Sequence, residues 1–158
     1  MPYRFLFGLI ASLSVFACTA SAQDNIVLQV SDAATSVKLS LADLDAMPQV
    51  TFETTTTWTN GGVTFSGVSL KALLETLGTN GDSIEMAALN DYSVTMPVSE
   101  LTTDAPIIAT RMNGDVMSVR DKGPYWVVFP YDADPRFRTE TVYSRSVWQL
   151  NRLVVSAD

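Results

Sequence analysis

Histidine is absent from the sequence, and the single cysteine, Cys18, lies near the N-terminus. Beyond that cysteine the chain therefore has no Ser-His-Asp or Cys-His catalytic group, no zinc site built from His or Cys, and no c-type haem attachment. Any general acid or base there must be Asp, Glu, Lys or Tyr. The same part of the chain cannot form a disulfide, so its fold must rely on packing alone.

The sequence contains only one long apolar run, which is too short to span a bilayer stably. It covers residues 5–17, and small residues then lead to Ala20-Ser21-Ala22, an A-x-A cleavage pattern. This pattern predicts a secretory signal peptide over residues 1–22 that is removed before Gln23.

The competing interpretation of the N-terminus is a lipoprotein signal with Cys18 as the lipidated residue, which the bulky Phe16 disfavours. We therefore expect a periplasmic or secreted protein with no membrane span after cleavage. Residues 23–158 have the size of a single domain.

Basic residues are scarce in most of the chain. Residues 23–110 contain two basic and eleven acidic residues, a net charge of −9, whereas residues 111–158 contain seven basic and six acidic residues, a net charge of +1. The excess of negative charge disfavours nucleic acid and anionic membrane surfaces as partners. The concentration of cations in the C-terminal third still permits a local anion pocket there.

Short strand patterns alternate with turns after residue 22. We expect strands at residues 25–30, 36–41, 49–58, 83–89, 92–96, 106–112, 116–119, 125–129 and 147–155. Asn113-Gly114 is a strong hairpin signal. Ser40 resembles the start of a capping box for a short helix, and a second helix is expected between Ser69 and Gly78, where leucines recur at helical spacing. The patterns predict one α+β domain, predominantly β, with a few short helices.

Several segments together resemble the sulfite-oxidase-type, or YedY-like, molybdopterin-binding domain. Their order and spacing hold from about residue 49 to residue 155. The segments are Phe65-Ser66-Gly67-Val68-Ser69-Leu70 with Leu73-Leu74 and Gly78, Asn90-Asp91-Tyr92 with Met96-Pro97 and Glu100-Leu101, Ile108-Ala109 before Asn113-Gly114, Lys122-Gly123-Pro124 before Pro130, and Val147-Trp148.

The resemblance implies a molybdenum ion held by the dithiolene of a pterin cofactor and by one protein cysteine, shortly before the segment that matches residues 65–74. Here the corresponding stretch contains Thr54, Thr55, Thr56 and Thr57. A soft thiolate suits molybdenum, whereas a neutral hydroxyl binds the metal weakly. We therefore expect the fold without a protein metal ligand or a catalytic residue, and no cofactor, although the resemblance allows molybdopterin.

Candidate ligand-binding residues come first from the segments around this position. Trp58 lies beside the turn nearest the family's metal-ligand position, and Trp126 is a core or cleft-lining aromatic residue. Asn90, Asp91 and Tyr92 resemble a family segment beside the mouth of the active site, and their alternative role is a hairpin turn.

Four cations, Arg111, Lys122, Arg138 and Arg145, complete the candidate site. Arginine presents a planar fork to phosphate or carboxylate, so we expect the four to converge on one anion pocket, with Trp58, Tyr92 and Trp126 lining the same cleft. The alternative is that the cations balance the acidic residues of the preceding segment, and that residues 131–136 form an ion-paired loop of their own.

The leading functional hypothesis is an exported, non-catalytic domain of the molybdopterin-dependent oxidoreductase fold that binds a small anionic ligand or a protein partner. One alternative is a genuine molybdopterin-dependent oxidoreductase with an atypical metal site. The other is a periplasmic interaction module that partners a membrane sensor or a redox protein.

Overall fold

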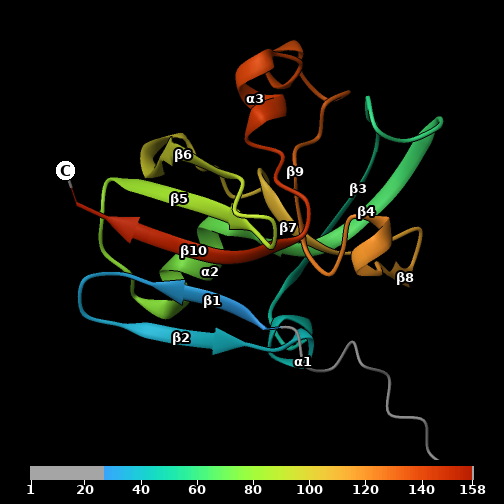
Figure 1. Cartoon of the computed structure of the whole chain (residues 1–158). Coiled ribbons are helices and arrows are strands. Elements are labelled where there is room, and N and C mark those ends of the chain that lie inside the picture. The colour runs from blue at the N-terminus through green and yellow to red at the C-terminus, as the bar shows by residue number, and fades with distance from the viewer. Residues whose placement is uncertain (1–26, 158) are drawn as a thin grey trace, which may run out of the picture.

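The computed structural model describes residues 27–157, and the predicted signal peptide over residues 1–22, including Cys18, lies outside them. Figure 1 shows two β-sheets that meet near the middle of the molecule, with helix α3 (Glu140–Ser144) at the top of the view. The predicted α+β class, mainly β with short helices, is confirmed. No helix in the described range is long and apolar enough to cross a membrane.

The first sheet has the strand order β2-β1-β10-β5-β6. Its strands are β1 (Leu28–Ser31), β2 (Ser36–Leu39), β5 (Ser83–Ala88), β6 (Ser93–Pro97) and β10 (Leu150–Ser156). β1 runs parallel to β10, and the other neighbours are antiparallel. The end of the described chain therefore lies in the middle of this sheet, between its first strand and the β5–β6 hairpin.

The second sheet is built around β7 (Ile107–Met112). β3 (Gln49–Thr55) and β4 (Gly62–Ser69) form a long hairpin, and β4 pairs with one edge of β7. The other edge of β7 pairs with both β8 (Asp115–Val116) and β9 (Trp126–Val128). At Gly67 the two backbones approach so closely that an added Cβ would lie 1.9 Å from the carbonyl oxygen of Ile108, which explains the need for glycine there.

The helices begin at the residues that their caps predict. α1 (Leu41–Asp45) has a capping box between Ser40 and Asp43, and α2 (Leu70–Leu77) starts after Ser69 and ends at Gly78 in a left-handed conformation. α3 was not expected from the sequence. Its Thr139 accepts a hydrogen bond from the backbone N–H of Val142, but its five residues are too few to show a helical apolar period.

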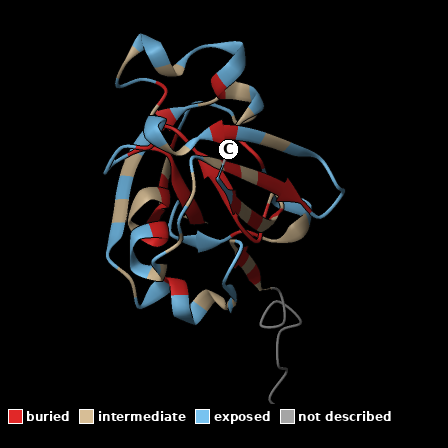
Figure 2. Cartoon of the chain, turned by 90° about the vertical axis from the view of Figure 1, so that its left-hand side faces the viewer, coloured by how far each residue is buried: buried red, intermediate tan, exposed pale blue. Residues whose placement is uncertain are grey.

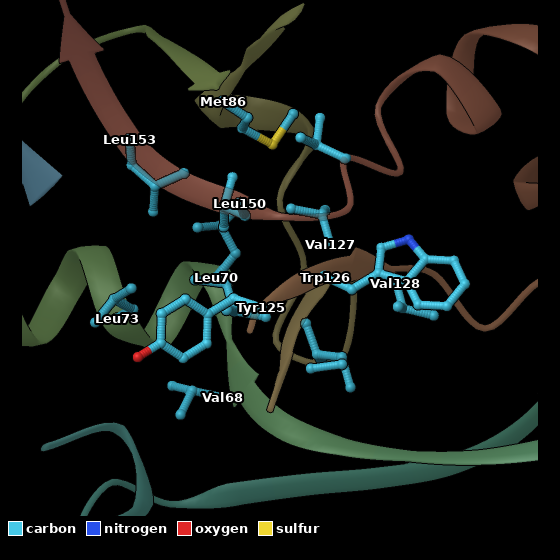
Figure 3. Close-up of a cluster of buried hydrophobic side chains, with 14 of the residues drawn as sticks. Val68, Leu70, Leu73, Met86, Tyr125, Trp126, Val127, Val128, Leu150 and Leu153 are labelled. Carbon is cyan, nitrogen blue, oxygen red and sulfur yellow. The ribbon is translucent and has the colours of Figure 1, made fainter. Parts of the chain in front are cut away.

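The core lies between the two sheets and α2. Figure 3 shows Leu150 and Leu153 of β10 pointing toward Leu70 and Leu73 of α2, and each of the four side chains is fully buried. Figure 2 shows the buried residues concentrated in the central strands, with exposed residues along the outer loops. The domain therefore has the continuous apolar core that a chain without disulfides beyond residue 22 requires.

Several expected strands differ from the structure: the one at residues 49–58 ends at Thr55, the one at residues 116–119 is reduced to β8 because Val119 begins a helical turn, and two further differences affect the site. β4 was not assigned as a strand, because Gly67 and two serines weaken its apolar pattern. The strand expected at residues 147–155 begins only at Leu150, because Gln149 has φ 52° and interrupts the extended backbone. Val147 and Trp148 therefore lie in a loop ahead of the strand, where they can face a pocket.

Candidate functional site

An aromatic pocket opens where four chain segments meet. It has a volume of about 240 Å³ and is lined by Trp58, Ala88, Asn90, Tyr92, Tyr143, Ser144, Ser146, Val147 and Trp148. The segments are the β3–β4 connection, the β5–β6 turn, α3, and the loop between α3 and β10. We call this the aromatic pocket. None of the described residues that line it carries a carboxylate, guanidinium or ammonium group.

Trp58 is the centre of the aromatic contacts around this pocket. Its ring packs edge-to-face against those of Trp126, Tyr131, Tyr143 and Trp148, with ring centroids 5.6–6.4 Å apart. Such pairs stabilise by about 0.5–1.5 kcal/mol each beyond the area that they bury. Because Trp126 and Tyr131 are buried and Trp148 is 38% exposed, Trp58 links the core to the mouth of the pocket.

The floor of the pocket is held by hydrogen bonds to Ser146. Its hydroxyl accepts from the Tyr131 hydroxyl at 2.6 Å and donates to the Val142 carbonyl at 2.8 Å, and its carbonyl accepts from the Trp126 indole at 3.2 Å. Burial raises the pKa of Tyr131 to about 12, so the phenol stays neutral and remains a donor at physiological pH. These bonds fix the loop that presents Trp148.

The β5–β6 turn forms one rim of the pocket, and it is a hairpin turn as well as part of the site. Asp91 has φ 65°, and the Asn90 side chain accepts from the Tyr92 backbone N–H at 3.1 Å. The Tyr92 hydroxyl donates to the Ser144 carbonyl at 2.8 Å, which ties this turn to α3. Asn90 and Tyr92 line the pocket, whereas Asp91 is exposed and absent from the lining.

Two hydrogen-bond donors of the pocket are unused. Within residues 27–157, the only buried side-chain nitrogen or oxygen without a partner is Asn151 Oδ1. The indole N–H of Trp58 and the hydroxyl of Tyr143 also lack a hydrogen bond within this range, so both atoms must reach solvent. Both residues line the pocket, and each therefore carries a donor that is open to solvent.

Lys122 is the predicted cation that lies nearest to these walls. Its ammonium is 5.8 Å from the ring centroid of Trp126 and 5.6 Å from that of Trp148. Lys122 adopts a left-handed conformation, and its carbonyl accepts from the Gln149 N–H, which places it behind Trp148. A cation near two indoles gives this side of the pocket a positive potential.

Three of the four hydroxyls in the threonine turn, residues 54–57, take part in hydrogen bonds within the described range, and the fourth belongs to the exposed Thr57. Thr54 Oγ1 accepts from the Asp132 backbone N–H at 3.1 Å, and Thr55 donates from its N–H and its hydroxyl to the Asp132 carboxylate at 2.6 and 2.8 Å. These bonds lower the pKa of Asp132. Thr56 Oγ1 bonds with the Thr59 hydroxyl and accepts from the Trp58 N–H.

Neutral hydroxyls are therefore present where the resemblance places a thiolate, and this donor set does not fit molybdenum. Among the described residues, no cluster of three or more His, Cys, Asp or Glu side chains could hold a metal ion. The aromatic pocket beside the turn has walls that suit the pterin part of such a cofactor. The described residues of the threonine turn thus do not fit the metal of the group, and the aromatic walls of the pocket offer surfaces that a flat ring can contact.

The expected convergence of the four cations is wrong. Arg111 lines a hollow with Asp45 and donates to both carboxylate oxygens, at 2.5 and 2.7 Å. Arg145 lines a different hollow and bonds to Glu100 at 2.6 Å. Both acids belong to the acidic segment before residue 111, so these two arginines balance it, as the alternative expectation stated.

The remaining predicted residues, Arg138 and Trp126, lie outside the lining of the aromatic pocket. Arg138 ends the short helical turn Pro135–Phe137, and its charge acts on Asp132. In the same loop, Arg136 pairs with Asp134 at 3.6 Å, as expected for an ion-paired loop. Trp126 lies behind Trp58 and does not line the pocket.

Sequence reasoning missed the contribution of α3 and of the loop that follows it. Tyr143, Ser144 and Ser146 line the pocket but were not candidates, and Trp148 was noted only as part of a segment that carries the family resemblance. The available signal was the sequence Val147-Trp148, which belongs to the family resemblance. Its role depends on Gln149, whose backbone conformation no sequence pattern indicates.

Comparisons with known proteins agree with this fold. The sulfane dehydrogenase SoxCD from Paracoccus pantotrophus has a crystal structure that matches with a TM-score of 0.67 and 16% sequence identity, over 87% of this chain and 39% of the SoxCD chain. The chain thus spans well under half of the SoxCD chain, and the match shows a shared fold. No curated protein matches the sequence. The family model for the oxidoreductase molybdopterin binding domain matches residues 16–133, and the chain therefore belongs to that family.

Proposed function

We propose that this chain is an exported, non-catalytic member of its family that binds a small, planar, anionic ligand of the pterin class in the aromatic pocket. The observation that carries the proposal is the presentation of Trp148 and Tyr92 at the pocket mouth, 38% and 47% exposed. Aromatic side chains held in water beside a pocket, instead of being packed away, are typical of a binding surface.

The pocket chemistry supports a ring with several hydrogen-bond acceptors. The exposed ring of Trp148 can stack against a flat ring, and the free donors of Trp58 and Tyr143 can meet ring nitrogens or a carbonyl oxygen. A pterin offers such acceptors, and it is the organic part of the cofactor that the family description names. Lys122 behind Trp148 favours a ligand with negative charge.

The absence of catalysis is inferred from the threonine turn. Its four hydroxyls are neutral alcohols, and those of Thr54, Thr55 and Thr56 are already hydrogen-bonded, so the turn supplies neither a soft metal ligand nor a proton acceptor. The protein purified from a host that makes molybdopterin should therefore contain no stoichiometric molybdenum. One molybdenum per chain, with a pterin released on denaturation, would instead establish the enzyme alternative.

Ligand binding can be tested with pterin-6-carboxylate, followed by quenching of tryptophan fluorescence and by calorimetry. Trp148→Ala should weaken binding about tenfold or more, because one stacking contact contributes about 1–3 kcal/mol. Val116→Ala is a matched control, since Val116 is 38% exposed and does not line the pocket. No binding by the unmodified protein, or equal affinities for the two variants, would contradict the proposal.

A protein partner at the same mouth is the second candidate function. Leu89 is 42% exposed, and its backbone N–H donates to the carbonyl of Gln149, the residue that follows Trp148 in the sequence. Leu89 thus extends the exposed apolar surface beyond the pocket. A photocrosslinker at position 89 should capture a specific exported or membrane protein in the native host, whereas one at position 116 should not.

Export is proposed from the N-terminal pattern and can be measured directly. The mature protein should begin at Gln23, and mass spectrometry of the intact exported protein would decide this. A diacylglycerol adduct on Cys18 would instead place the domain on a membrane.

A further inference from the structure

A second hollow is lined in part by Val142 of α3 and by Arg145, which directly follows this helix. Its volume is about 410 Å³, and its lining includes Ser99, Glu100, Phe129, Arg136, Phe137 and Arg145. We call this the basic hollow. Its lining contains two guanidinium groups and one carboxylate, in a chain that is strongly acidic overall.

Arg145 is incompletely paired although it is nearly enclosed. Its side chain is 13% exposed, and the only hydrogen bond of that side chain within the described range goes from Nη1 to Glu100 Oε2. Arg111 differs, because it donates from both Nη atoms to both oxygens of Asp45. A guanidinium has five N–H donors in a fixed fork, so Arg145 retains donors that a second anion can accept.

Arg136 is held beside this hollow without a side-chain hydrogen bond in the described part of the chain. Its guanidinium carbon lies 4.7 Å from the centroid of the Phe137 ring, and its Nε is 3.6 Å from Asp134, too far for a hydrogen bond. Stacking on Phe137 orients the planar group while its N–H donors stay free. Phe137 in turn contacts Phe129, with ring centroids 5.9 Å apart, so the hollow combines an apolar floor with a cationic rim.

Glu100 occupies the position that an external anion would take. It follows Ser99 in the three-residue turn Val98–Glu100, and its side chain is 50% exposed, whereas that of Arg145 is 13% exposed. An exposed carboxylate gains little from pairing, because water competes well for it. It can therefore be displaced at low cost by a ligand that engages both arginines.

We propose that Arg136 and Arg145 form a binding site for a small oxyanion, such as phosphate or the phosphate group of a monoester, with Glu100 as the internal counter-ion that the ligand displaces. This site is separate from the aromatic pocket and does not depend on the function proposed for it. The apolar floor formed by Phe129 and Phe137 favours a monoester with a small apolar body over the free anion.

The probes are inorganic phosphate and phenyl phosphate, each titrated into the full-length exported protein at low ionic strength, with backbone amide NMR shifts as the readout. Arg136→Gln should weaken binding of both about tenfold or more, because a charge-assisted hydrogen bond contributes about 1.5–3 kcal/mol, or roughly 13- to 160-fold in affinity. Arg120→Gln is the matched control, since Arg120 is exposed, lies outside the hollow and carries the same charge.

Glu100→Gln gives the decisive comparison, because it preserves the side-chain shape and removes the counter-ion. It should raise phosphate affinity several-fold, whereas an ion pair with a purely structural role predicts lower stability and unchanged affinity. Tighter binding of phenyl phosphate than of inorganic phosphate would identify an organic ester as the source of the anion. Equal binding would identify the free anion. Either result supports an oxyanion site in the basic hollow. An unchanged affinity in Glu100→Gln, or equal losses in Arg136→Gln and Arg120→Gln, would overturn the proposal.

Trp148→Ala separates this inference from the pterin proposal. It should weaken pterin-6-carboxylate binding and leave phosphate binding unchanged, and Arg136→Gln should do the reverse. Loss of phosphate binding in Trp148→Ala would show one continuous site and would refute a separate oxyanion site.

Discussion

Helix α3 contributes to two hollows with opposite chemistry. Tyr143 and Ser144 line the aromatic pocket, whereas Val142 and Arg145, the residues on either side of that pair, line the basic hollow. Among the described residues, the first hollow has aromatic walls and no charged lining group, and the second has two arginines and one carboxylate, that of Glu100. One short helix thus supports two environments because neighbouring residues on a helix point in different directions.

The comparison teaches that the basic residues of the C-terminal third serve different purposes. Arg111 is satisfied by both oxygens of Asp45, whereas Arg145 shares only one bond with Glu100. Lys122 lies against two tryptophan rings. The clustering of cations in the sequence does not indicate where an anion can bind. What indicates it is how many hydrogen bonds each arginine makes to a carboxylate and how exposed that carboxylate is.

Trp58→Ala should produce the largest effect on the aromatic side. It removes four edge-to-face contacts at once and should lower the free energy of unfolding by about 3 kcal/mol, the low end for a tryptophan deletion because Trp58 is only partly buried. Urea denaturation would measure this loss. Trp58→Phe should recover part of it, and an equal loss in both variants would show that ring contact is not the cause.

The next largest effect should come from salt, which should weaken ligand binding in the basic hollow more than in the aromatic pocket. Raising the ionic strength from about 0.02 to 0.5 M shortens the Debye length severalfold and should weaken phosphate binding about tenfold. Pterin-6-carboxylate binding should change much less, because aromatic contacts are not screened. Calorimetry at the two salt concentrations would test this. A parallel loss for both ligands would mean that charge dominates in each hollow, and the contrast drawn above would then be wrong.

Local sequence signals predicted much of the fold. The capping box at Ser40, the Gly78 stop and the Asn113-Gly114 turn all occur as expected, since each depends on a few neighbouring residues. β4 was missed because its place in the sheet depends on close contact between Gly67 and β7, which are far apart in the sequence. Such tertiary contacts override a weak local pattern.

The candidate site was predicted only in part, for a related reason. Trp58, Asn90 and Tyr92 do meet in one pocket, as the family resemblance suggested. The arginines do not, because ion pairing with Asp45 and Glu100 is decided by the fold and not by sequence spacing. Ser146 carries no motif, and only the structure shows that it joins Tyr131, Trp126 and α3.

Low pH should act on the hydrogen bonds between Thr55 and Asp132 beside the aromatic pocket, and not on the residues that line the pocket. The bonds from Thr55 lower the pKa of Asp132 below its ordinary value near 3.8, so the folded state binds fewer protons there than the unfolded state. The stability that these bonds supply is present above that ordinary value and is lost as pH falls through the lowered pKa. Thermal unfolding should therefore be nearly constant from pH 7 to 5 and decline below about pH 4. Asp132→Asn should flatten that decline, and an unchanged acid profile would exclude Asp132 as its source.

The smallest effect is expected for Arg111→Gln, which tests whether paired arginines act only locally. Arg111 and Asp45 are 30% and 34% exposed, and a partly exposed pair contributes about 0–1 kcal/mol to stability. The variant should therefore unfold at nearly the same urea concentration and bind phosphate and pterin-6-carboxylate unchanged. Its measurable consequence should be the pKa of Asp45, which the Arg111 guanidinium holds below the ordinary range and which should rise toward it in an NMR titration. If phosphate binding instead fell about tenfold, a 1.4 kcal/mol effect, long-range charge and not the unpaired donors of Arg145 would control the basic hollow, because Arg111 does not line it.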